Sequence, residues 1–268
     1  MPTINVRDIA INYEQSGAGP TIILVHGLGS SLRDWDHLVP ALAEHYRVVS
    51  LDLRGHGQSS RKGPITITSF ASDVLALADA LEIDAFYIGG ISMGTAVAFQ
   101  LAVDAPSRVR GLVVINGGPE GLSPSNPQHV AELELRVGAI ERHGMSAIGE
   151  LLAPRLLPLP EHAEMRRVFV ERWAQNDQAM YLASLRALVG WSVREELAVV
   201  DMPVCAIAAD NDYTPVEHKR AYVNQLAHAE LVVIPSSGHM TTHDQPAALV
   251  TAMRAFLDAN LAPRGISP

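Results

Sequence analysis

The chain has 268 residues, of which 48% are hydrophobic and 18% charged, and its formal net charge is −9. A chain of this length and apolar content can bury a substantial core, so its composition excludes intrinsic disorder. The 20 Lys and Arg residues are outnumbered by 29 Asp and Glu residues and form no basic cluster. This composition argues against nucleic-acid and anionic-membrane partners. Cys205 is the single cysteine, which excludes an internal disulfide. With no signal-peptide pattern in the first 20 residues, we expect a cytoplasmic protein.

Short runs rich in valine and isoleucine recur along the chain and predict buried strands. Strands that are apolar on both faces are typical of a parallel sheet covered by helices. The predicted strands are Thr21–His26, Arg47–Leu51, Ala85–Ile88, Val109–Ile115, Val204–Ala208 and Leu231–Ile234. The N-terminal stretch Thr3–Tyr13 instead favours an antiparallel hairpin at the edge of the sheet.

Helical patterns separate these strands. In the clearest of them, an apolar stripe is formed by Ile67, Phe70, Val74, Leu77 and Leu81. A second stripe follows Pro246, a residue suited to the first turn of a helix. Strands that alternate with helices predict an α/β fold with a mostly parallel sheet.

The segment 119–200 interrupts this alternation. It contains no convincing strand, but it carries helical stripes and a proline-rich bend at Pro154, Pro158 and Pro160. A segment of this length is too long for a loop, and we expect a helical insertion packed against the sheet edge. The predicted organisation is a core of residues 1–118 and 201–268 with an inserted helical unit of residues 119–200.

One uncharged stretch, Ala85–Val103, approaches the length of a membrane span. Gly89, Gly90, Ser92 and Gly94 cluster in its middle, where they would weaken a single helix. A buried strand, a tight turn and a buried helix account for this stretch better than a membrane segment.

The turn in that stretch, Gly90-Ile91-Ser92-Met93-Gly94, has the form G-x-S-x-G. It follows a predicted strand and precedes a predicted helix that starts near Thr95. On such a turn the serine hydroxyl projects above the sheet, where it can act as a nucleophile. The alternative is a glycine-rich turn in which Ser92 only caps the helix.

A serine nucleophile needs a base, and the base needs an orienting acid. In this arrangement the chain order is serine, acid, histidine. His239 follows the last strand at the same end of the sheet as Ser92, and it is the predicted base. The predicted acid is Asp212, after the strand Val204–Ala208; Asp210 is the alternative, and Glu120 a more distant one.

Three other histidines have structural explanations. His26 and His56 precede glycines in turns, where they would brace loops by hydrogen bonds, and His243 beside Asp244 suits helix capping.

The oxyanion of an acyl-transfer reaction requires preorganised donors. The backbone N–H of Met93 directly follows the nucleophile and is one predicted donor. The second is the N–H of Leu28, in the loop after the first parallel strand.

That loop also carries Gly27-x-Gly29, with Asp52 23 residues further on, as in a dinucleotide-binding fingerprint. Leu32 occupies the place of the third glycine and would block the close helix–strand approach. The sequence contains no H-E-x-x-H motif, and the only cysteine lies inside a predicted strand. We therefore expect neither a cofactor nor a metal.

Together these residues resemble the α/β-hydrolase superfamily, specifically its cap-bearing members. The matching segments are His26–Gly29, Asp52–Ser59, Gly90–Gly94, Asp212 and Gly238-His239. The resemblance implies an eight-stranded, mostly parallel sheet with helices on both faces and a helical cap after the sixth strand. It also implies Ser92, Asp212 and His239 as a catalytic triad. Two departures are Thr95, where many relatives have glycine, and a bulky Leu28 in the oxyanion loop.

The leading hypothesis is a serine hydrolase that cleaves a carboxylic ester of a small apolar molecule. Rivals with the same triad are an enol-lactonase, a hydrolase of carbon–carbon bonds in ring-fission products and a cofactor-free perhydrolase; a non-catalytic sensor is a rival of another class. An acidic substrate would need a cationic anchor, for which Arg33, Arg155 and Arg186 are candidates. Candidate pocket residues are Leu152, Leu156, Phe169, Trp173, Met180 and Trp191.

Overall fold

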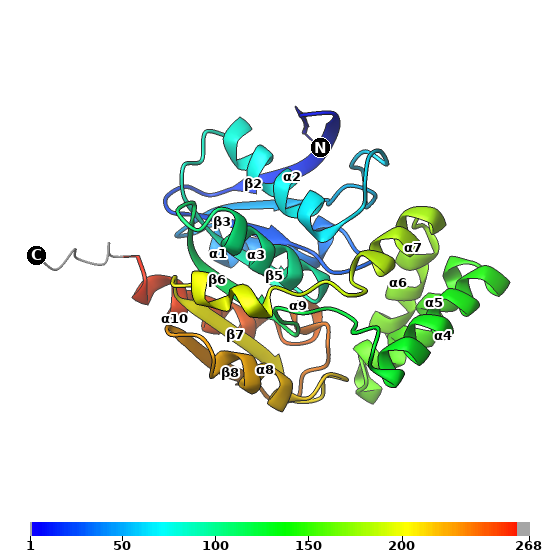
Figure 1. Cartoon of the computed structure of the whole chain (residues 1–268). Coiled ribbons are helices and arrows are strands. Elements are labelled where there is room, and N and C mark those ends of the chain that lie inside the picture. Colours follow the sequence, from blue (N-terminus) through cyan, green and yellow to red (C-terminus); the bar gives the residue numbers. More distant parts are fainter. Residues whose placement is uncertain (1, 262–268) are drawn as a thin grey trace, which may run out of the picture.

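The structure, a computed structural model, describes residues 2–261, and these form one eight-stranded sheet (Figure 1). The strand order across the sheet is β1-β2-β4-β3-β5-β6-β7-β8. The strands are β1 (Thr3–Val6), β2 (Ile9–Ser16), β3 (Thr21–Val25), β4 (Arg47–Leu51), β5 (Phe86–Ile91), β6 (Val109–Ile115), β7 (Val204–Ala209) and β8 (Ala229–Ile234).

The six strands from β3 to β8 pair in parallel, and β1 and β2 form an antiparallel hairpin that adds to β4. Every residue of β5 and β7 is buried, which explains why their sequences are continuously apolar. The predicted mostly parallel sheet with an antiparallel edge is confirmed.

Helices cover both faces of the sheet, and each face has its own apolar core. Helices α2 and α3 contact each other and contribute to the core on one face, to which α8 adds Tyr222 and Val223. On the other face, α1 and α10 contact each other and contribute to the second core. The bounds are α1 (Val39–Leu42), α2 (Ile67–Ala80), α3 (Met93–Asp104), α8 (Val216–Val223), α9 (Thr241–Asp244), α10 (Pro246–Ala259) and the short η1 (Leu32–Trp35).

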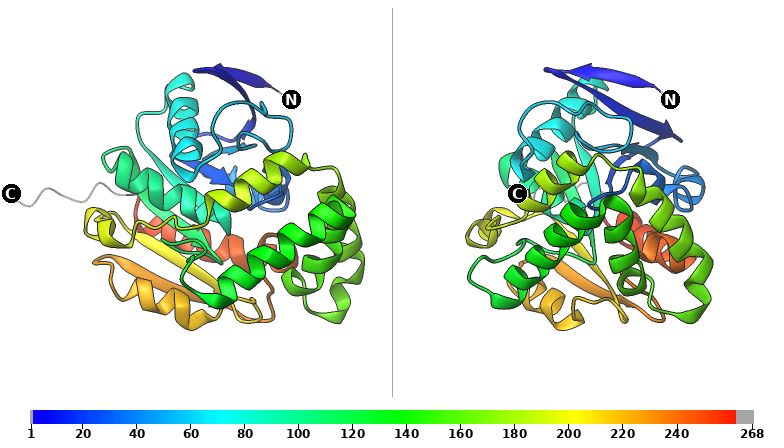
Figure 2. Two further views of the ribbon diagram at one scale, coloured as in Figure 1. Left: turned by 45° about the vertical axis from the view of Figure 1, so that its right-hand side comes forward. Right: turned by 90° about the vertical axis from the view of Figure 1, so that its right-hand side faces the viewer.

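Four α-helices lie between β6 and β7 in the chain and gather at one end of the sheet, which Figures 1 and 2 show from three directions. We call α4 to α7 the inserted helices. Their bounds are α4 (Pro127–His143), α5 (Met145–Leu156), α6 (Ala163–Ala174) and α7 (Gln178–Ala187), with the short helices η2 (Pro160–His162) and η3 (Arg194–Val199).

The inserted helices have a core of their own, which includes Ile148, Phe169 and Leu185. This core also contains Met240, from the loop after β8, so it continues into the sheet-bearing part of the molecule. Val193 and Leu197, near the end of the segment 119–200, instead belong to the core of the sheet. The last eight residues of that segment therefore pack with the sheet rather than with the inserted helices.

The uncharged stretch Ala85–Val103 folds as strand β5, a turn and helix α3. Within residues 2–261, no helix is long and apolar enough to cross a membrane.

Candidate active site

Ser92 lies on the sharp turn between β5 and α3, with backbone angles φ 54° and ψ −118°. A positive φ is strained for a residue with a Cβ, and such strain is concentrated at functional sites. The flanking glycines make the turn possible. A Cβ at Gly90 would lie 2.2 Å from the carbonyl oxygen of Gly94, and one at Gly94 would lie 2.2 Å from the carbonyl oxygen of Val25.

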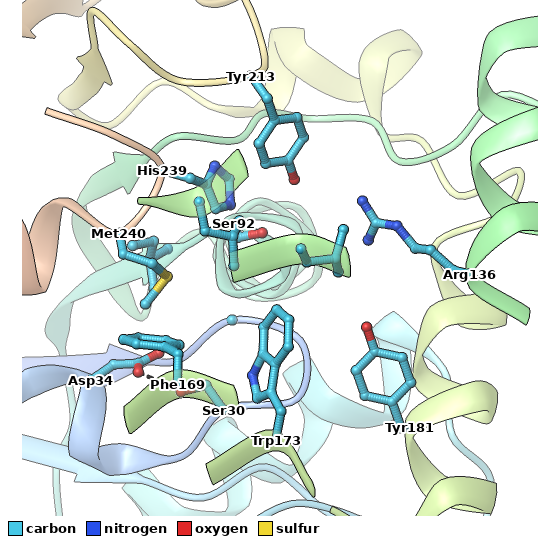
Figure 3. A pocket seen from close by; sticks show the side chains of 14 residues that line it. Ser30, Asp34, Ser92, Arg136, Phe169, Trp173, Tyr181, Tyr213, His239 and Met240 are labelled. Carbon is cyan, nitrogen blue, oxygen red and sulfur yellow. Dashed lines mark hydrogen bonds between the residues drawn. The ribbon is translucent and has the colours of Figure 1, made fainter. Parts of the chain in front are cut away.

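The Ser92 side chain makes no capping hydrogen bond to α3, so helix capping does not explain the residue. Its backbone is held from two sides: the Ser92 N–H donates to Ile115 O at 2.9 Å, and the Thr95 hydroxyl donates to Ser92 O at 2.6 Å. The Thr95 hydroxyl thus stabilises the turn through this hydrogen bond. The Ser92 hydroxyl is left facing the pocket shown in Figure 3.

His239 and Ser92 line the same pocket (Figure 3). His239 Nδ1 lies 2.8 Å from Asp212 Oδ1, and both side chains are almost fully buried. An ionised carboxylate can only accept hydrogen bonds, so Nδ1 carries the proton and Nε2 is the basic nitrogen. Among the described residues, Ser92 and His239 make no direct hydrogen bond.

Asp212 and Asp210 differ clearly in their partners. Asp210 is exposed, and its Oδ1 accepts hydrogen bonds from the backbone N–H of Ser237 at 3.0 Å and from the side chain of Asn211 at 2.8 Å. It therefore fixes the turn, as expected for the alternative acid, while Asp212 contacts the histidine. Glu120 pairs with Arg194 at 3.1 Å and is not among the pocket residues.

A buried lysine completes the surroundings of Asp212. Lys219 Nζ donates to Asp212 Oδ2 at 2.6 Å, and the Thr214 hydroxyl donates to the same oxygen at 2.5 Å. Burial alone would raise the pKa of Asp212, but the interactions with His239 and Lys219 outweigh it and hold that pKa well below its ordinary value. Asp212 is therefore ionised throughout the pH range in which enzymes ordinarily work.

Asn116, directly after β6, ties the loops of His239 and Asp212 together. Its side-chain amide donates to His239 O at 2.8 Å, and its Oδ1 accepts from the N–H of Ala209, the last residue of β7, at 2.8 Å. Asp244 holds the loop from the other side, because it accepts hydrogen bonds from the Gly238 N–H and the Ser237 hydroxyl. The backbone around His239 is thus held by Asn116 and Asp244, and Asn116 also joins it to the end of β7.

The predicted oxyanion donors flank Ser92. Met93 is the first residue of α3, and the loop after β3 brings Gly27 against the serine: a Cβ at Gly27 would lie 3.4 Å from Ser92 Cβ. Leu28 is partly buried, and its side chain packs against both the sheet core and the core of the inserted helices. Met93 thus follows Ser92 in the chain, and Gly27, the neighbour of Leu28, lies against Ser92 in space. That the N–H groups of Leu28 and Met93 are the oxyanion donors stays a prediction.

Four of the six predicted pocket residues line the pocket: Leu152, Leu156, Phe169 and Trp173. The other two lie elsewhere. Met180 packs against the loop at Gly55, where a Cβ would lie 3.2 Å from Met180 Cβ. Trp191 donates to Gln100 Oε1 at 2.8 Å and packs against the sheet core. These two predictions are corrected, because apolar character in the segment 119–200 does not reveal which way a side chain points.

Six further pocket residues, most of them polar, were not predicted from the sequence: Ser30, Asp34, Arg136, Tyr181, Tyr213 and Met240. Tyr213 and Met240 directly follow the predicted acid and base, a signal that could have found them. Asp34 is fully buried, accepts a hydrogen bond from the Ser30 hydroxyl, and leaves its Oδ2 without a partner among the described residues. None of the three arginines considered as anchors, Arg33, Arg155 and Arg186, is among the pocket residues. Arg33 pairs with Glu14 and Asp36, and Arg155 pairs with Glu132.

The remaining motif residues hold loops. His26 contacts Gly27 O through Nδ1 at 2.7 Å and accepts from the Leu53 N–H through Nε2 at 3.0 Å. The Asp52 carboxylate accepts from the N–H groups of Leu32 and Gln58, so it holds its own loop and joins that loop to the one after β3. His243 lies in α9 and contacts the Thr242 hydroxyl. In residues 2–261 there is no group of three or more His, Cys, Asp or Glu side chains placed to hold a metal ion.

Comparison with known proteins agrees with this fold. The family model described as the alpha/beta hydrolase fold matches residues 20–246. The chain is 29% identical to 3-oxoadipate enol-lactonase 2 of Acinetobacter baylyi, over 95% of this chain and 96% of that protein.

Two solved structures superpose closely on this one. The enol-lactonase from Burkholderia xenovorans LB400 has a TM-score of 0.88 and 25% identity, covering 96% of this chain and 100% of the other. A thermophilic esterase from Thermogutta terrifontis has a TM-score of 0.89 and 24% identity, covering 98% of this chain and 100% of the other, and this likeness concerns the fold alone. The family match spans most of the chain, the sheet has the expected topology and Ser92 occupies the strained turn after β5: the protein belongs to the alpha/beta hydrolase family.

Proposed function

We propose that the protein is a serine hydrolase that cleaves a carboxylic ester of a small molecule, with Ser92 as nucleophile, His239 as base and Asp212 as the orienting acid. One observation carries the proposal. Ser92 sits in a strained turn without a capping role, in the same pocket as a histidine whose Nδ1 is bound to a buried, ionised carboxylate. This is the arrangement that a serine nucleophile needs in order to lose its proton.

In the first half of the reaction, His239 Nε2 takes the Ser92 proton while Oγ attacks the ester carbonyl. Asp212 stabilises the imidazolium that forms, and the N–H groups of Leu28 and Met93 stabilise the oxyanion. The bond between the carbonyl carbon and the alkoxy oxygen then breaks. The proton on Nε2 passes to that oxygen, so the alcohol leaves and an acyl group remains on Ser92.

In the second half, His239 takes a proton from a water molecule as that water attacks the acyl carbonyl. The second tetrahedral intermediate uses the same two oxyanion donors. When it collapses, Ser92 regains its proton from His239 and the carboxylic acid leaves. The inserted helices act as a cap over this chemistry, because Leu152, Leu156 and Phe169 form an apolar wall of the pocket.

A lactone is the second candidate substrate, and the similarity to proteins named as enol-lactonases favours it. The steps are the same, except that the alcohol stays attached to the acyl group after ring opening. The site needs no additional residue for this variant of the reaction.

Replacement of Ser92 by alanine tests the proposal. We expect Ser92→Ala to lower the kcat for p-nitrophenyl butyrate by about 10⁴-fold or more, because the nucleophile is lost while binding is kept. Ser125→Ala, at an exposed serine before α4, is the matched control and should keep the wild-type rate. Hydrolysis by Ser92→Ala at a rate within tenfold of wild type would remove the triad from consideration.

A further inference from the structure

Two arginines and one carboxylate form a cluster where α4 meets α5 beside the pocket: Arg136 and Glu132 lie on α4, and Arg155 lies on α5. Glu132 Oε1 accepts from Arg136 Nε at 2.6 Å, and both oxygens of Glu132 accept from Arg155 Nη1 at 2.8 Å. Burial would raise the pKa of Glu132, but the two arginines outweigh it and lower that pKa, so the residue is anionic. Two guanidinium groups and one carboxylate leave the cluster with one uncompensated positive charge.

Arg136 is the member of the cluster that reaches the pocket. It lines the cavity together with Ser92 and His239, and its side chain is only 12% exposed. The hydrogen bond to Glu132 uses Nε, so the two terminal nitrogens of the guanidinium are the atoms left for other partners. Figure 3 shows the guanidinium pointing into the cavity on the side opposite Met240.

Two tyrosines complete this end of the cavity. The hydroxyls of Tyr181 and Tyr213 point toward Arg136 from opposite sides (Figure 3). Burial raises the pKa of Tyr181 to about 12, so its hydroxyl is neutral and can donate a hydrogen bond. Tyr213 is held by Arg155, whose guanidinium carbon lies 5.0 Å from the ring centre. A guanidinium between two hydroxyl donors matches the two oxygens of a carboxylate.

The other carboxylates around the pocket already have cationic partners of their own. Asp212 is paired with Lys219 at 2.6 Å, and Asp34 lies 3.5 Å from an Arg172 nitrogen. Neither of them forms an ion pair with Arg136. A buried cation without a full counterion is costly, and a bound anion would relieve that cost.

We propose that Arg136, with Tyr181 and Tyr213, binds a carboxylate on the substrate, so that the natural substrate is an ester or lactone carrying a carboxylate remote from the scissile carbonyl. This inference rests on the proposed function, because it places the reacting carbonyl at Ser92. The anchor fixes the acidic end of the substrate under α4, and the apolar side chains of α5 and α6 cover the chain between the two groups.

A pair of esters that differ in one charge and one methyl group tests this inference. The pair is p-nitrophenyl hydrogen adipate and its neutral counterpart, methyl p-nitrophenyl adipate. We expect the wild-type enzyme to favour the acid in kcat/KM by about tenfold or more, the range of one charge-assisted hydrogen bond. Arg136→Met should lower this ratio by about tenfold or more, with most of the change in KM for the acid.

Two further variants sharpen the comparison. Glu132→Gln removes the shared counterion and should raise the ratio above the wild-type value. Arg167→Met removes the same charge from an exposed position on α6 that is paired with Glu164 and Glu171, and it should leave the ratio unchanged. Charge changes at the surface are thereby separated from charge changes in the pocket.

The outcomes distinguish this inference from the proposed function. A wild-type ratio below one, or a ratio that Arg136→Met leaves unchanged, overturns the carboxylate site even if Ser92-dependent hydrolysis is intact. If the wild type hydrolyses neither ester, the proposed function fails, and the carboxylate site is then decided by calorimetry with monomethyl adipate. Binding that weakens about tenfold in Arg136→Met supports the site, and equal or absent binding to both proteins overturns it.

Discussion

Asp212 has the most elaborate surroundings of the residues in the candidate triad. Its two carboxylate oxygens have different partners: Oδ1 accepts from His239, and Oδ2 accepts from Lys219 and Thr214. The lysine, which is itself buried, keeps the carboxylate ionised. Burial lowers the pKa of Lys219 from its ordinary value, although the pairing with Asp212 opposes that shift. Because Asp212 stays charged, its protonation should not be what limits activity in acid.

Substitution of each of the two aspartates after β7 tests which of them is the acid. Asp212→Asn should lower kcat by about 10³- to 10⁴-fold, because the amide no longer fixes the tautomer of His239 or stabilises its charged form. Asp210→Asn is matched in chemistry and differs by two positions, and it should cost less than about tenfold, since Asp210 only closes a turn. Steady-state kinetics with one neutral ester checks both. An equal or larger loss at Asp210 would contradict the assignment of the acid.

The candidate triad could be predicted because each member follows the end of a strand. Parallel strands bring their carboxyl ends together, so Ser92, Asp212 and His239 had to lie near one another. The pocket residues of the inserted helices could not be predicted in this way. Met180 and Tyr181 are adjacent on α7, yet Tyr181 lines the pocket and Met180 packs at Gly55, since each step along a helix turns the side chain by 100°.

Among the elements, the strands of the sheet were predicted to within about three residues, and the turn at Ser92 was predicted but is shorter than expected. The predicted strand Ala85–Ile88 extends to Ile91 as β5, because Gly89 and Gly90 belong to the sheet rather than to a turn. A Cβ at Gly89 would lie 2.8 Å from the side chain of Leu24, so glycine is needed there for packing. Helix α3 likewise begins at Met93, two residues before the predicted start.

The inserted helices show the limit of sequence patterns. Apolar stripes predict that the segment 119–200 is helical, but they do not predict how those helices are placed relative to the sheet. That placement depends on tertiary contacts such as the hydrogen bond from the Met240 N–H to Leu156 O at 3.3 Å, which joins the loop of His239 to the end of α5. The position of Arg136 in the pocket follows from this docking, and its sequence neighbours carry no signal for it.

For the whole molecule, the buried histidines predict how stability depends on pH. Burial lowers the pKa of His56 to about 3 and that of His243 to about 4. In the unfolded chain a histidine titrates near pH 6.5, so below about pH 6.5 the unfolded state binds more protons than the folded state. The free energy of unfolding should therefore fall as the pH drops from about 6.5 toward the folded-state values.

Replacement of His56 isolates one of these contributions. His56→Gln should reduce the slope of the unfolding free energy against pH by up to about 1.4 kcal/mol per pH unit between pH 6 and 4.5. Urea titrations at several pH values measure that slope. The exposed His218 offers a control, because His218→Gln should leave the slope as it is in the wild type. A His56→Gln slope equal to that of the wild type would show that His56 is not buried in its neutral form.

The central claim, that Ser92 is the nucleophile, is tested most directly by covalent capture. A fluorophosphonate ester reacts with an activated serine, and peptide mass spectrometry then locates the adduct. We predict a single adduct on the peptide that contains Ser92, formed much more slowly in Asp212→Asn and absent in His239→Ala. An adduct on a different residue, or ester hydrolysis by a protein that forms no adduct, would contradict the account.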